Sequence, residues 1–193
     1  MNIADLETLD YPPLTADLEE AKAHLDEYGM ALIENVLTAK EVEEMDQRLN
    51  EQFLGEEKHQ VGSKLRGDEG LGVQSPEEEK VSRLIWNLLN KGDCFLKLLD
   101  HPKILPLVQH LIGEKVCLCS IGAHMNGSGN ERMALHQDQW PLVPHPMDFP
   151  FMANVMYLIS DNSPENGGTR LIPGSHNWPL LDYKTANSEA IQQ

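Results

Sequence analysis

The sequence predicts an α+β domain, mainly β in its second half, in which helices come first and strands follow. The chain has 193 residues, enough for one domain with a hydrophobic core. Apolar residues recur at helical spacing up to about residue 114. From Lys115 onward, short apolar stretches alternate with clusters of Gly, Pro, Asn and Asp, as strands and turns do. We therefore expect one domain, residues 1–193, with residues 1–114 mainly helical, rather than alternating βαβ units.

The first helix is predicted at residues 15–28, where the apolar residues share one helix face and Gly29 follows as a stop. A short strand is expected at residues 30–37, MALIENVL. Thr38 is a suitable N-cap for a second helix, because Glu41 stands three residues later and completes a capping box.

The second helix is expected to end near Phe53. Residues 55–74 are polar and contain glycine, which is typical of a long loop. Ser75 followed by Pro76 predicts the start of a third helix, since proline suits the first helical position. The apolar residues at helical spacing in this third helix are Val81, Leu84, Ile85, Leu88 and Leu89. A last helical piece is expected at residues 101–113.

The second half contains four candidate strands bounded by turn residues. They are residues 115–125, 131–139, 151–160 and 167–176. The first carries Cys117 and Cys119, which a strand would point to one face. We expect both to be small buried hydrophobic residues, because the three cysteines of the chain form no disulfide-like framework.

The chain is strongly acidic, with a formal net charge of −16. Residues 1–57 hold sixteen acidic residues against three basic ones, which indicates solvated helix faces or an acidic docking surface. No basic stretch follows a phosphate backbone, so we expect no nucleic-acid partner. No apolar run reaches the length of a membrane span, and the N-terminal residues lack a signal-peptide layout. These features predict a cytoplasmic protein with no membrane partner.

A histidine and an aspartate stand two residues apart in ALHQDQWPL, as His136 and Asp138. On a strand both side chains would project from one face, with their Cα atoms roughly 6.5–7 Å apart. An imidazole nitrogen and a carboxylate oxygen are suitable ligands for a divalent metal ion. Taken alone, the pair is a weak signal, because a histidine beside an aspartate more often forms a simple hydrogen-bonded pair than a metal site.

A second motif, ENGGTRLIPGSHNWP, follows at residues 165–179. Together with HQD it resembles the phytanoyl-CoA dioxygenase family of iron(II)- and 2-oxoglutarate-dependent oxygenases. The preceding stretches YGMALIENVL, TAKEVEEM and HPKILPLVQHLIG agree with the layout of that family. The resemblance extends from about residue 17 to residue 179.

The resemblance implies a double-stranded β-helix, a cupin-like jelly-roll barrel flanked by N-terminal helices. Residues 115–193 would form the first part of that barrel. It also implies a metal site of two histidines and one carboxylate, with open positions for 2-oxoglutarate and dioxygen. His136 and Asp138 match the first two iron ligands and are the predicted catalytic residues. The implied reaction hydroxylates a small organic molecule and decarboxylates 2-oxoglutarate to succinate; an acidic ligand at Asp138 disfavours halogenation.

Thr169 and Asn154 are the predicted contacts to 2-oxoglutarate. Some relatives use the threonine of this motif for that purpose, and Asn154 lies where relatives place a residue that faces the cosubstrate. The alternatives are an ordinary strand residue for Thr169 and a structural hydrogen bond for Asn154, because a polar side chain in an apolar strand needs a partner.

The family's third ligand, a later histidine, and its 2-oxoglutarate-binding arginine are not in the expected place, since 17 residues follow His176. His176 matches the histidine of PGSH, which shapes a turn in the family, and His124 and His145 match no ligand position. About five strands are visible where a closed barrel needs about eight. We expect the N-terminal portion of a longer oxygenase. A non-catalytic cupin-like binding module with an incomplete triad and a metal-dependent isomerase remain alternatives.

Overall fold

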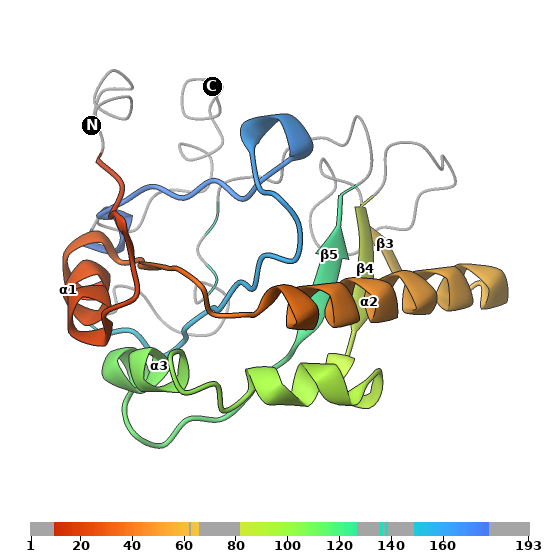
Figure 1. Cartoon of the computed structure of the whole chain (residues 1–193). Coiled ribbons are helices and arrows are strands. Elements are labelled where there is room, and N and C mark those ends of the chain that lie inside the picture. Colours follow the sequence, from red (N-terminus) through yellow and green to blue (C-terminus); the bar gives the residue numbers. More distant parts are fainter. Residues whose placement is uncertain are drawn as a thin grey trace.

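The computed structural model describes residues 10–61, 63–65, 82–126, 136, 138 and 149–177. Its α-helices are α1 (Leu18–Tyr28), α2 (Ala39–His59) and α3 (Leu105–Ile112). Its strands are β1 (Leu14–Thr15), β2 (Leu32–Ile33), β3 (Ser63–Leu65), β4 (Ser82–Trp86) and β5 (Gly122–Met125). Short 3-10 helices are η3 (Leu88–Asn90), η4 (Asp93–Leu98), η6 (Pro164–Asn166) and η7 (Ser175–Asn177). Figure 1 shows α2 crossing the β3–β4–β5 sheet, with α1 and α3 at the other end of the molecule.

The predicted first helix is confirmed as α1, but it begins three residues late. Asp17 is the N-cap, and its carboxylate accepts hydrogen bonds from the backbone N–H groups of Glu19 and Glu20, both at 2.9 Å. Thr15 belongs instead to β1, which pairs in parallel with β2. The helix ends as predicted at Gly29, whose φ of 72° is left-handed.

The capping box predicted for α2 is confirmed, with Thr38 as N-cap and Glu41 as its reciprocal partner. The predicted end near Phe53 is wrong, because the helix continues to His59. A single glycine at position 55 costs only about 1 kcal/mol in a helix interior. Good helix formers follow it, and Gln60 then ends the helix in a left-handed conformation.

The predicted third helix is wrong where the structure describes it. Residues 82–86 form β4, the central strand of an antiparallel sheet with β3 and β5 on either side. Leu84 and Ile85 are 2% and 0% exposed, so both faces of this strand are covered. A strand buried on both faces has consecutive apolar residues, which periodicity alone does not distinguish from a buried helix. The predicted loop at 55–74 likewise contains the end of α2 and β3.

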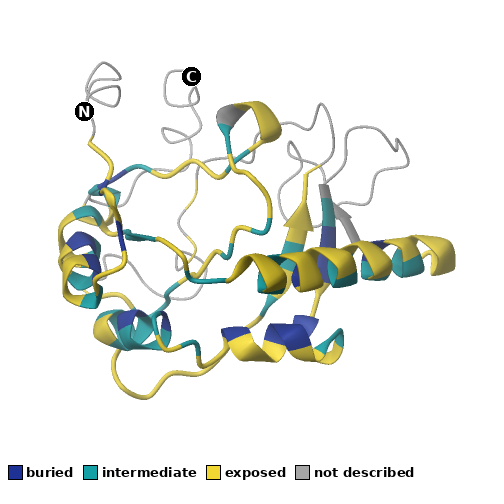
Figure 2. Cartoon of the chain, in the orientation of Figure 1, coloured by how far each residue is buried: buried dark blue, intermediate teal, exposed yellow. Residues whose placement is uncertain are grey.

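The main hydrophobic cluster lies between α2, β4 and the two 3-10 helices that follow β4. Its buried members are Met45, Phe53, Ile85, Leu88, Cys94, Phe95 and Leu98. Tyr157 and Ile159 pack against it from the second half of the chain. The Tyr157 hydroxyl also donates a hydrogen bond to the Leu98 carbonyl at 2.9 Å. Figure 2 shows the outward face of α2 as mostly exposed and η4 beneath it as partly buried.

The jelly-roll barrel stays a prediction. The described residues contain one two-stranded and one three-stranded sheet and no closed barrel. Of the candidate strand at residues 115–125, only Gly122–Met125 pairs, and neither 151–160 nor the described part of 167–176 forms a strand. A strand requires a hydrogen-bonded neighbour, and no described residue pairs with these segments. Cys117 and Cys119 are exposed, so their predicted burial is wrong.

Residues 131–139 fall outside the described part of the chain except for His136 and Asp138, and neither of these is in a strand. None of the described helices combines the length and apolar character needed to cross a bilayer.

Gly29 offers a test of the packing between α1 and the distant PGSH turn. A Cβ atom at Gly29 would collide with the His176 ring, and its φ of 72° disfavours any L side chain. We expect Gly29→Ala to lower the free energy of unfolding by more than about 1 kcal/mol, as measured by urea titration. Gly55→Ala is the matched control, because it places its Cβ in open space inside a helix and should raise stability by about 1 kcal/mol. Equal stability of Gly29→Ala and wild type would contradict the packing.

Tyr157 predicts a pH dependence of stability. Burial raises the pKa of Tyr157 to about 12, against about 10 in the unfolded chain. The protonated Tyr157 side chain therefore makes its full contribution to the free energy of unfolding below pH 10, and this contribution is lost as the pH rises toward 12. Wild type should exceed Tyr157→Phe by about 1 kcal/mol at pH 8, from the hydrogen bond to Leu98. This difference in stability between wild type and Tyr157→Phe should disappear near pH 11, because wild type has by then lost about 1 kcal/mol of its free energy of unfolding. A constant gap in urea titrations from pH 8 to 11 would refute the shift.

Candidate metal centre

His136 and Asp138 face one another directly. The His136 Nε2 atom lies 3.2 Å from the Asp138 Oδ1 atom, and the two side chains are 46% and 53% exposed. The predicted strand placement is wrong, because Asp138 lies in a turn. In a regular strand the two side chains would project in parallel, whereas a turn allows them to converge. The pair is thus half-open to solvent and accessible to small molecules.

Asn154 completes a group of three side chains. Its Nδ2 atom donates a hydrogen bond to the Asp138 Oδ2 atom at 2.5 Å. Both carboxylate oxygens of Asp138 therefore accept a hydrogen bond, one from His136 and one from Asn154. The hydrogen bond from His136 lowers the pKa of Asp138 most, and that from Asn154 lowers it further, against the opposing effect of burial. The carboxylate is consequently charged at neutral pH, as a metal ligand must be.

The geometry of this pair fits a shared divalent ion. Metal–nitrogen and metal–oxygen bonds of about 2.0–2.2 Å place two neighbouring ligands of an octahedral ion about 3 Å apart. The separation of 3.2 Å between Nε2 and Oδ1 is close to that value, so an ion could replace the proton between them. Within the described ranges, no group of three or more His, Cys, Asp and Glu residues gathers. The facial triad expected from the sequence would need a third ligand beside this pair.

Thr169 is separate from this group in the described contacts. It is exposed and follows a tight turn, in which the Gly168 N–H donates to the Ser163 carbonyl at 2.8 Å. No hydrogen bond or ion pair among the described residues joins Thr169 to His136, Asp138 or Asn154. Its predicted contact to 2-oxoglutarate remains a prediction.

His176 lies in a turn, η7, as predicted for the PGSH motif. Its ring packs over Gly29 at the end of α1, and Nε2 lies 3.3 Å from the Asp26 carbonyl oxygen. The Gly174 N–H donates to the Tyr28 carbonyl at 2.7 Å. These contacts attach the motif to α1 and give His176 a structural role.

Sequence reasoning expected a partner for Asn154 but did not identify it. The observed hydrogen bond to Asp138 is the kind of structural contact that the alternative expected, and the cosubstrate contact of Asn154 stays a prediction. The signal was a polar residue in an apolar segment, and its partner stands 16 residues earlier. No local spacing links Asn154 to Asp138, so the sequence alone does not specify this pair.

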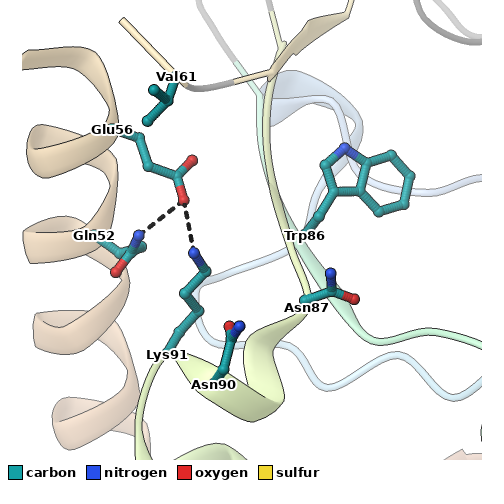
Figure 3. A pocket seen from close by; sticks show the side chains of 7 residues that line it. All are labelled: Gln52, Glu56, Val61, Trp86, Asn87, Asn90 and Lys91. Atoms are coloured by element: carbon teal, nitrogen blue, oxygen red, sulfur yellow. Dashed lines mark hydrogen bonds and ion pairs between the residues drawn. The ribbon is translucent and has the colours of Figure 1, made fainter. Parts of the chain in front are cut away.

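A cavity of about 290 Å³ lies elsewhere, where α2 meets the end of β4 and η3. Glu56 accepts a hydrogen bond from Gln52 at 2.8 Å and forms an ion pair with Lys91 at 3.5 Å; Figure 3 shows both interactions. These polar side chains neutralise one another and connect α2 to η3. None of the predicted site residues lines this cavity, so the candidate metal centre is a different place.

The convergence of His136 and Asp138 makes this region a candidate metal centre, and sequence comparison gives the family of the chain. Residues 25–190 match the family described as phytanoyl-CoA dioxygenase (PhyH). The chain belongs to the phytanoyl-CoA dioxygenase family, which confirms the resemblance inferred from HQD and PGSH.

Three curated relatives illustrate the similarity. The dioxygenase af480 of Aspergillus fumigatus is 30% identical over 166 residues, covering 86% of this chain and 51% of the relative. The dioxygenase sphC of the same species is 26% identical, covering 86% and 47%. A probable alpha-ketoglutarate-dependent hypophosphite dioxygenase of Stutzerimonas stutzeri is 25% identical, covering 88% and 57%. The chain thus spans about half the length of these relatives. No solved structure matches it.

Proposed function

We propose that this protein is an iron(II)- and 2-oxoglutarate-dependent dioxygenase that hydroxylates a small organic molecule. 2-Oxoglutarate would be decarboxylated to succinate in the same reaction. The observation that carries the proposal is the convergence of His136 and Asp138 at 3.2 Å in a chain of the phytanoyl-CoA dioxygenase family. The name of the Stutzerimonas relative, alpha-ketoglutarate-dependent, supports the choice of cosubstrate.

His136 and Asp138 would bind the metal through different atoms. His136 would contribute a neutral imidazole nitrogen, and Asp138 would contribute one carboxylate oxygen and one negative charge. Bound iron(II), with 2-oxoglutarate and dioxygen, would supply the oxidising chemistry that protein side chains lack. The half-exposed positions of both side chains leave a path for cosubstrate and substrate to reach the metal.

The cosubstrate contacts follow from the donors that remain. 2-Oxoglutarate carries two carboxylates, so it requires hydrogen-bond donors or cations around it. The exposed Thr169 hydroxyl is one proposed donor. The Asn154 amide has two N–H groups, and Asp138 uses one of them, which leaves a second for 2-oxoglutarate.

The test of this proposal uses the full-length protein that the gene encodes. Anaerobic addition of iron(II) and 2-oxoglutarate should produce the weak visible charge-transfer band of such complexes, and admission of air should yield succinate. His136→Ala and Asp138→Ala should each abolish the band. Each should also reduce succinate formation by more than 100-fold, because loss of a residue that only supports a metal ligand already costs about 10–100-fold. His59→Ala, an exposed histidine at the end of α2, is the matched control and should behave like wild type.

Two outcomes would overturn the proposal. Metal binding without any succinate in air would identify a non-catalytic binding module. A band that persists in both His136→Ala and Asp138→Ala would place the iron at other residues.

A further inference from the structure

We propose that Asn154 is a positioning residue for Asp138. Its amide holds the Asp138 Oδ2 atom, so that the Oδ1 atom alone binds the metal. The inference rests on the proposed function for its consequence, although the contact itself is independent of any metal. It adds this role of one Asn154 N–H group to the 2-oxoglutarate contact proposed for the other.

The first step of the argument is the orientation of the carboxylate. The torsion that turns an aspartate carboxylate is broad and poorly restrained by itself. Here Oδ1 is 3.2 Å from His136 Nε2, and Oδ2 accepts the hydrogen bond from Asn154 Nδ2. Contacts on both oxygens fix the plane of the carboxylate. Hydrogen bonds to a charged acceptor are roughly twice as strong as neutral ones, so this restraint acts even at a half-exposed position.

The second step is the number of positions left on the metal. Two histidines and one carboxylate oxygen leave three positions of an octahedral ion open. If Asp138 bound with both oxygens, it would occupy one of those three. The hydrogen bond from Asn154 engages Oδ2 and thereby favours binding through Oδ1 alone. The amide thus preserves the position that 2-oxoglutarate or dioxygen requires.

The third step is the support of Asn154 itself. It lies in a segment that makes no strand in the described structure, so backbone pairing does not hold it. Three residues later Tyr157 packs against the main hydrophobic cluster and donates its hydroxyl hydrogen to the Leu98 carbonyl. Ile159 packs against the same cluster. The hydrophobic core therefore anchors the segment that presents Asn154 to Asp138.

A metal-free experiment tests the contact. The side-chain amide signals of Asn154 are assigned in ¹⁵N-labelled protein by their loss in Asn154→Asp. In Asp138→Ala these signals should shift and exchange faster with water, because their acceptor is gone. Asp100→Ala, an exposed aspartate in a turn, is the control and should leave them unchanged. Unchanged Asn154 signals in Asp138→Ala would overturn the inference.

A metal titration tests the consequence. Cobalt(II) replaces iron(II) as a visible probe of both affinity and coordination number. Asn154→Ala and the similarly sized Asn154→Leu, which both lack an N–H donor and add no charge, should weaken cobalt(II) binding by about 10–100-fold and change its visible spectrum. Asn90→Ala removes an exposed amide on η3 and should change neither. Circular dichroism of each variant verifies that the fold is retained.

The outcomes separate this inference from the proposed function. If His136→Ala binds cobalt(II) like wild type, the proposed metal site is wrong, and the amide signals still decide the contact. If His136→Ala loses cobalt(II) while both Asn154 variants keep wild-type affinity and spectrum, the metal site stands and the positioning role is refuted.

Discussion

The hydrophobic cluster between α2, β4 and η4 is the constraint on which the other described parts depend. Ile85 and Phe95 are 0% and 2% exposed at its centre, and burial of each such side chain contributes about 1.5–3 kcal/mol. Met45 and Phe53 bring α2 onto the same cluster. The strand β4 can be central in its sheet because α2 and the 3-10 helices provide apolar cover for it. Without this cluster, α2 and the sheet would lose the apolar packing that holds them against each other.

The same cluster reaches the candidate metal centre through one segment. Tyr157 and Ile159 pack on it, and Asn154 stands three residues before Tyr157 on the way to Asp138. Packing in the first half of the chain thus helps to orient a carboxylate in the second half. The helices of the first half thus provide the surface on which Tyr157 and Ile159 rest.

The centre itself combines a fixed pair of donors with an open surrounding. His136 and Asp138 converge closely enough to share an ion, yet each is about half exposed. A closed structural metal site excludes other ligands, whereas an oxygenase must admit a cosubstrate and dioxygen. The openness of the pair is therefore consistent with the proposed chemistry, and the hydrogen bond from Asn154 compensates for the missing enclosure by orienting Asp138.

The sequence by itself determined the features that depend on neighbours within four residues. Thr38 and Glu41 determine the start of α2, and Gly29 determines the end of α1. The spacing of His136 and Asp138 predicts two candidate metal donors close together. Tertiary structure alone decided that residues 82–86 are a strand, that His176 packs on Gly29, and that Asn154 meets Asp138. Caps and paired motifs are made by local hydrogen bonds, which a sequence displays directly. Strand pairing and long-range hydrogen bonds depend on which distant segments the hydrophobic core brings together.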